Sequence, residues 1–318
     1  MLHLRIIAPA ARTEDVLKAV DVTVGTAHVA VLTGAARDPQ GDVVLCDVAR
    51  EAADGLLADL RALGLAEEGA VVVESVDLAL SDRAEQAKID APGEGVDAVV
   101  WESLADATSE EAQLSVTYLT FLTIATMLAA CGVMLDNAIL IVGAMVVGPE
   151  FGPLAGLCTG LVRRAPRLVW RSGAALLVGF AAAMLLTGAF SQLMDVLPGS
   201  DGTLFSKTQY ESEHPISAFI WNPDLMSVVV AVLAGVAGIM SLTSAKSGAL
   251  VGVAISVTTV PAAANAALAL SYGHFGQSWN SMVQLLVNLA GIVFGGVVTL
   301  LAQKAFWARK RRRRPAAA

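Results

Sequence analysis

Charged residues are scarce in this chain: they make up 16% of its 318 residues, whereas 55% are hydrophobic. Soluble domains carry about 25% charged residues, so this composition predicts a protein that buries much of its surface in lipid. The shortage is uneven, because residues 1–113 hold 22 acidic and 8 basic side chains, and residues 114–318 hold 7 and 13. The acidic first part argues against nucleic acid as a partner.

Cysteine is also scarce, and Cys46, Cys131 and Cys158 are too scattered for a disulfide framework or a metal site. The chain has no nucleophile–base pair, no glycine-rich phosphate loop and no dinucleotide motif. We therefore expect no catalytic residues, no cofactor and no metal. The first residues lack an apolar run of adequate length, so we expect no signal peptide.

Residues 1–80 alternate between strand and helix patterns. Strand-like runs cover 2–8, 27–33, 43–48 and 70–76, and helical patterns open at Thr13 and Arg50. The order β-α-β-β-α-β predicts a ferredoxin-like α+β domain on the cytoplasmic side. A regulatory or assembly role for it is an analogy at the level of the fold. His3 and His28 have no evident partners, so we interpret them as structural or surface residues.

Residues 81–113 are acidic and weakly periodic, with the turn-forming Pro92–Gly95 in the middle. They predict a linker that ends in an amphipathic helix near the membrane surface. Trp101 is either an interfacial anchor or a packing residue.

The transmembrane region, 114–306, contains six long apolar segments, and a spanning helix needs about 20 such residues. They cover 118–135, 138–162, 168–193, 225–242, 248–270 and 282–306. With six crossings, the basic residues at 163–171, at Lys246 and at 304–314 fall on one side. The positive-inside rule then predicts a multi-pass membrane protein with both termini in the cytoplasm. In the tail, 307–318, the run Arg309–Arg314 is either a topology signal or a site for anionic lipid.

The second and fifth apolar segments resemble each other, since both follow a polar turn and both run into proline, at Pro149 and Pro153 or at Pro261. This predicts an inverted repeat of three helices followed by three more, with interrupted helices, as in secondary transporters. Glycines such as Gly143, Gly152 and Gly252 would equally serve close helix packing.

Glu150 is the only acid well inside an apolar segment, in the run Gly148–Pro153. A buried carboxylate is costly unless it is paired, protonated or hydrated. Glu150 is therefore either a proton- or cation-coupling group or a hydrated residue near the interface. Four amides at membrane depth are candidates for ion or solute contact, or else form interhelical hydrogen bonds: Asn137, Asn265, Gln284 and Asn288. Thr258 and Thr259 are further candidates, or else bond back to their own helix.

The run Ile139–Pro153, ILIVGAMVVGPEFGP, resembles the signature of a prokaryotic membrane family, the uncharacterised hydrophobic domain or domain of unknown function 389. The run LVGVAISVTTVPAAANAAL at 250–268 is similar to the second motif of that family. The resemblance covers roughly 99–306. It implies a protein of a prokaryotic inner membrane and leaves the activity open. Glu150 stands where the family usually has an apolar residue, so a coupling role for it would be specific to this chain.

Together these features predict a multi-pass homo-oligomer that transports or conducts a small solute or ion and is regulated or assembled by its cytoplasmic domain. The alternative is a sensor or scaffold whose membrane part only anchors and oligomerises the cytoplasmic domain. Interrupted helices favour transport, because an anchor has no need of them.

Overall fold

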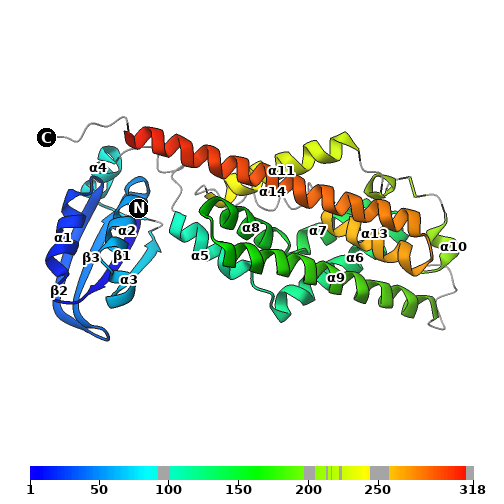
Figure 1. Ribbon diagram of the computed structural model, residues 1–318, viewed down its shortest axis with the longest axis horizontal. Helices are drawn as coiled ribbons and strands as arrows, with labels where there is room; N and C mark the ends of the chain where they lie inside the picture. The colour runs from blue at the N-terminus through cyan, green and yellow to red at the C-terminus, as the bar shows by residue number, and fades with distance from the viewer. Residues whose placement is uncertain are drawn as a thin grey trace. The chain divides into compact units, whose positions relative to one another are not determined.

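The computed structural model describes residues 1–76, 78–91, 101–196, 205–212, 214–215, 217–221, 224–243 and 258–312. The chain forms two compact units (Figure 1). The first comprises Met1–Leu104 with Thr243–Ala245, and the second comprises Ala105–Leu242 with Lys246–Ala318.

The first unit is built on an antiparallel four-stranded sheet in the order β2-β3-β1-β4. Its strands are β1 (Leu2–Ala8), β2 (Thr26–Arg37), β3 (Gln40–Val48) and β4 (Ala70–Ser75). Helix α1 (Thr13–Val22) follows β1, and α2 (Arg50–Ala62) and the short α3 (Leu65–Glu68) lie between β3 and β4. Each strand and helix predicted over 1–76 is present, and α3 is added.

The core of the first unit lies on one face of the sheet. Leu4 and Ile6 alternate with more exposed residues along β1, as the period of a strand requires. They pack in one cluster with Val16 of α1 and with Leu56 and Leu60 of α2, all fully buried. The apolar stripes of the two helices therefore cover the apolar face of the sheet.

The segment predicted as a linker contains helix α4 (Asp82–Asp90) before α5 (Trp101–Glu111). The Ser81 hydroxyl caps α4 by accepting a hydrogen bond from the Ala84 N–H at 3.3 Å. Ala84 and Ala87 are buried, and α4 contacts β2. The hydrophobic pattern of the sequence did not predict α4, because its buried face consists of alanines, which add little to such a pattern.

The second unit is helical. Its elements are α6 (Val116–Met134), α7 (Ala138–Val147), α8 (Phe151–Arg163), α9 (Pro166–Val196), α10 (Lys207–Tyr210), the 3₁₀ helix η2 (Ala218–Trp221), α11 (Leu225–Thr243), α13 (Thr259–Ser271) and α14 (Phe275–Arg312). Four described helices, α6, α9, α11 and α14, are long and apolar enough to cross a membrane. Counting the bent pair α7 and α8 as one span makes five. This is the profile of a multi-pass membrane protein.

The fifth predicted span, 248–270, is described only from Thr258 onward, and residues 248–257 lie outside the described residues. The described part contains α13, an apolar helix of 13 residues, which is shorter than a span. The described part of the chain therefore supports four to five spans.

Two short helices lie between long ones in the second unit. Helix α8 packs against α9 and α14, and α13 packs against the same two helices (Figure 1). Helix α6 contacts α7, α9 and α13. Glycines bring α11 and α14 close together, since a Cβ at Gly235 would overlap the Ile292 carbonyl and one at Gly295 the Val232 carbonyl.

Candidate functional site

The broken helix predicted at Gly148–Pro153 is present. Helix α7 ends at Gly148, whose backbone is extended, and α8 starts after Glu150 with its axis bent by 51°. Proline disfavours the helical conformation in the residue before it, so Pro149 forces Gly148 out of the helix. Pro153 does not break α8, because it lies in the first turn of that helix. Backbone N–H groups in a first turn have no intrahelical acceptor, so the N–H that proline lacks costs no hydrogen bond there.

Helix α13 begins in the same way as α8. Pro261 is the third residue of α13, as Pro153 is the third residue of α8. Neither helix is capped by a side-chain hydrogen bond from its own preceding residue, Thr258 or Glu150. Both helices therefore present uncapped amino-terminal ends, which carry partial positive charge.

Glu150 joins these two helix ends. Its side chain is 6% exposed, and its Oε1 accepts a hydrogen bond of 2.7 Å from the hydroxyl of Thr259, the first residue of α13. Its Oε2 is buried and has no partner among the described residues. A carboxylate held at two amino-terminal helix ends is an arrangement that suits an ion or proton site.

The two helices run away from Glu150 in opposite directions. Helix α8 ends at Arg163, beside the start of α9 at Pro166. Helix α13 ends at Ser271, whose carbonyl accepts a 2.7 Å hydrogen bond from Gln192 near the other end of α9. The two helices thus meet head to head partway along α9.

A second line of polar groups adjoins Glu150. The Thr258 hydroxyl accepts a 3.1 Å hydrogen bond from the Asn288 amide, and the Asn288 Oδ1 accepts one of 3.3 Å from the Gln284 amide. Gln284 and Asn288 are buried, and the Gln284 Oε1 has no described partner. Of the predicted candidates, Thr259 bonds Glu150 directly, and Asn288 bonds Thr258, the residue before Thr259.

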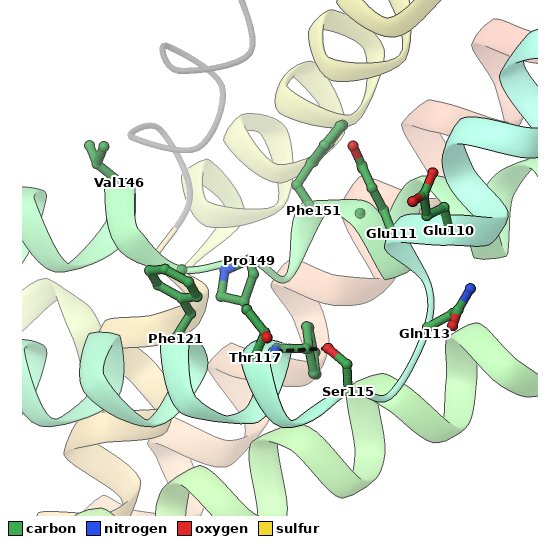
Figure 2. A pocket seen from close by; sticks show the side chains of 12 residues that line it. Glu110, Glu111, Gln113, Ser115, Thr117, Phe121, Val146, Pro149 and Phe151 are labelled. Carbon is green, nitrogen blue, oxygen red and sulfur yellow. Dashed lines mark hydrogen bonds between the residues drawn. The ribbon is translucent and has the colours of Figure 1, made fainter.

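A pocket of about 480 Å³ opens at the broken helix (Figure 2). Its walls come from the end of α5, the start of α6 and the break itself: Glu110, Glu111, Gln113, Ser115, Thr117, Tyr118, Phe121, Val146, Gly148, Pro149, Phe151 and Gly152. Desolvation, and then the negative charge of Glu110, raise the pKa of the Glu111 carboxyl. The described residues contain no cluster of His, Cys, Asp or Glu that could hold a metal ion.

Residues 145–294 match the sequence model of the family described as "Domain of unknown function (DUF389)". These residues are therefore similar to that family. The resemblance inferred from the two sequence motifs is confirmed. The DUF389 match begins inside α7 and ends inside α14, so it includes Glu150, Thr259 and Asn288.

A relative of this chain is the uncharacterized protein MJ0678 of Methanocaldococcus jannaschii. The two are 24% identical over 204 residues, which are 64% of this chain. The matched region spans 59% of the length of the archaeal protein. No solved structure matches the chain.

Other predicted residues lie apart from Glu150. Asn137 is exposed and caps α7 by accepting hydrogen bonds from the N–H groups of Ile139 and Leu140 at 3.0 and 3.1 Å. Asn265 is buried further along α13, where it accepts a 3.0 Å hydrogen bond from the Tyr210 hydroxyl and donates one of 2.7 Å to Ser281.

The predicted packing glycines differ from one another in their surroundings. A Cβ at Gly152 would lie 2.7 Å from the Cβ of Glu111, so Gly152 lets α5 approach α8. A Cβ at Gly143 would meet no described atom within 4 Å. Gly252 lies outside the described residues.

His3 and His28 have a partner that sequence reasoning missed. Both rings form hydrogen bonds with the carboxylate of Asp47 in β3, with each Nδ1 at 2.7 Å from one of its oxygens. The His28 Nε2 also lies 2.7 Å from the Ser81 hydroxyl. Burial raises the pKa of Asp47, but the two histidine hydrogen bonds outweigh it and lower that pKa overall. Only the pairing of β1, β2 and β3 brings these residues together.

Proposed function

We propose that this protein is a membrane transporter or channel for a small solute or ion. The observation that carries the proposal is the buried Glu150 carboxylate, which has one oxygen without a described partner where the amino-terminal ends of α8 and α13 meet. Half-helix ends and freed backbone groups are the usual materials of ion and solute sites in secondary transporters. A pure membrane anchor has no need to place a carboxylate there.

The packing supports an inverted repeat of three helices followed by three. In that repeat, α6, the pair α7 and α8, and α9 correspond to α11, the segment that ends in α13, and α14. The contacts agree with this repeat, since the two matching helices α8 and α13 each pack against both α9 and α14, which also match each other. The matched places of Pro153 and Pro261 fit as well. With six spans, both termini face the cytoplasm of a prokaryotic cell, beside the basic residues at 163–171.

The first unit then regulates or assembles the transporter. Its strand order and its β-α-β-β-α-β succession support a ferredoxin-like domain, a fold that often pairs with copies of itself. We include a homo-oligomer in the proposal on this ground, and contact of the basic run Arg309–Arg314 with anionic lipid on the ground of charge.

The test is flux through proteoliposomes that contain the full chain, measured for protons, inorganic ions and organic ions. We expect flux above that of empty liposomes, reduced about tenfold or more by Glu150→Gln, a barrier change of about 1.4 kcal/mol. Asp195→Asn is the matched control, since it removes an exposed carboxylate away from the break, and it should leave flux unchanged. If the folded protein carries no flux, the sensor or scaffold becomes the better explanation.

A further inference from the structure

The pocket at the break is too large for a bare inorganic ion. Its volume of about 480 Å³ falls in the range of small-molecule sites, about 300–1,000 Å³. Its walls come from three elements, α5, α6 and the segment between α7 and α8, so the fold of the second unit forms it. These dimensions indicate an organic ligand.

The charge of the pocket is negative. Glu110 and Glu111 both line it, and neither carboxylate makes an ion pair with a described basic side chain. Figure 2 shows the two glutamates at the end of α5, with Pro149 between them and Phe121 in this view. Neighbouring carboxylates without a basic partner favour a cationic ligand.

Aromatic rings complete the lining. Tyr118 and Phe121 come from α6, and Phe151 is the first residue of α8. Aromatic faces attract ammonium groups, and the attraction is stronger where water is excluded. An aromatic wall together with two carboxylates is the chemistry that recognises alkylammonium ions and amines.

The pocket adjoins the unpaired oxygen of Glu150. Gly148 lines the pocket, and a Cβ added to Gly148 would overlap the Glu150 Oε2. This oxygen belongs to a side chain that is 94% buried, and it has no described partner. Gly148 therefore lies against both the pocket and the buried carboxylate.

We propose that this pocket binds a small organic cation, an alkylammonium or amine, as the solute that the protein carries. The inference rests on the proposed transport function for the movement of the cation, and on the pocket alone for its binding. Glu110 and Glu111 supply the charge, Tyr118, Phe121 and Phe151 supply the aromatic wall, and Glu150 lies beyond Gly148 on the path into the protein.

The test is binding of radiolabelled tetraethylammonium to the full chain in detergent, by equilibrium dialysis, beside the flux assay. We expect saturable binding that choline displaces and sodium does not. The double variant Glu110→Gln with Glu111→Gln should weaken binding about tenfold or more, as should Phe121→Ala. Asp106→Asn is the matched control, because Asp106 is an exposed acid of the same helix outside the pocket, and it should bind normally.

The outcomes separate the two proposals. Ion flux that Glu150→Gln reduces, without saturable tetraethylammonium binding, would overturn the pocket assignment and leave the transport function standing. Binding that the double variant loses, without any flux, would support the pocket and overturn transport. Binding of equal strength in the double variant and in Asp106→Asn would overturn the pocket assignment.

Discussion

The Thr259 hydroxyl donates a 2.7 Å hydrogen bond to the Glu150 carboxylate across 109 residues of sequence. This bond joins the first residue of α13 to the residue that precedes α8. The bond therefore joins two helix ends, from different halves of the membrane region, into one site. The stability of that site can be tested by changing either partner.

Thr259→Val is expected to destabilise the protein by about 1–3 kcal/mol, because it keeps the side-chain shape and leaves both oxygens of a buried carboxylate without a partner. Thermal unfolding of the full chain in detergent measures this effect. Thr259→Ser keeps the hydroxyl and is the matched control. Equal midpoints for the two variants would mean that the hydrogen bond contributes nothing.

Gly148→Ala is expected to destabilise the break by about 1–3 kcal/mol and to reduce flux, because the new methyl group would overlap the Glu150 carboxylate and lie 2.8 Å from Val260. Gly143→Ala, inside the neighbouring helix α7, is the control. It meets no described atom and should be neutral or stabilising by up to about 1 kcal/mol. Both variants are measured by the same unfolding and flux assays. If they change stability and flux equally, the close contact of Gly148 with the Glu150 carboxylate is refuted.

Asp47 should make the first unit acid-sensitive. Its folded-state pKa is lower than its value in an unfolded chain, about 3.9, so its ionised form stabilises the fold above about pH 4. That stabilisation is lost as the pH falls through the folded-state pKa. Digestion of the full chain by an acid-active protease between about pH 2 and 6 measures opening of residues 1–76.

The variant Asp47→Asn should remove this part of the pH dependence and be cleaved more readily near pH 6. Asp59→Asn, at an exposed position of α2, should follow the natural protein. An unchanged profile in Asp47→Asn would show that the contacts with His3 and His28 do not control acid stability.

Cys46 should resist alkylation in the folded protein. It is fully buried, and desolvation, followed by the charge of Asp47, raises its pKa to about 11. At pH 8 only about one thiol in a thousand would then be ionised. Iodoacetamide labelling of the Cys131→Ser, Cys158→Ser variant, followed by mass spectrometry, isolates this thiol. Labelling should require denaturant, and rapid labelling without it would contradict the buried position.

The chain alone determined the strands, helices α1 and α2, the long apolar helices and the break between α7 and α8. These features depend on local properties: the period of apolar residues, the length of apolar runs and the exclusion of helical backbone before Pro149. Helix α4 was not predicted, because its buried alanines give a weak hydrophobic pattern. The sequence does not show where α8 begins, so it does not show that Pro153 lies in the first turn of that helix, where a proline causes no break.

Only the tertiary structure decided which polar residues meet. Asn137 and Thr259 were equally good candidates by hydropathy, yet one caps an exposed helix end and the other bonds Glu150. His3 and His28 had no visible partner until strand pairing brought Asp47 to both. A hydrophobic pattern specifies which face of an element is buried, but not which neighbour covers that face. The site at Glu150 therefore exists only because α8 and α13 pack between the same two long helices.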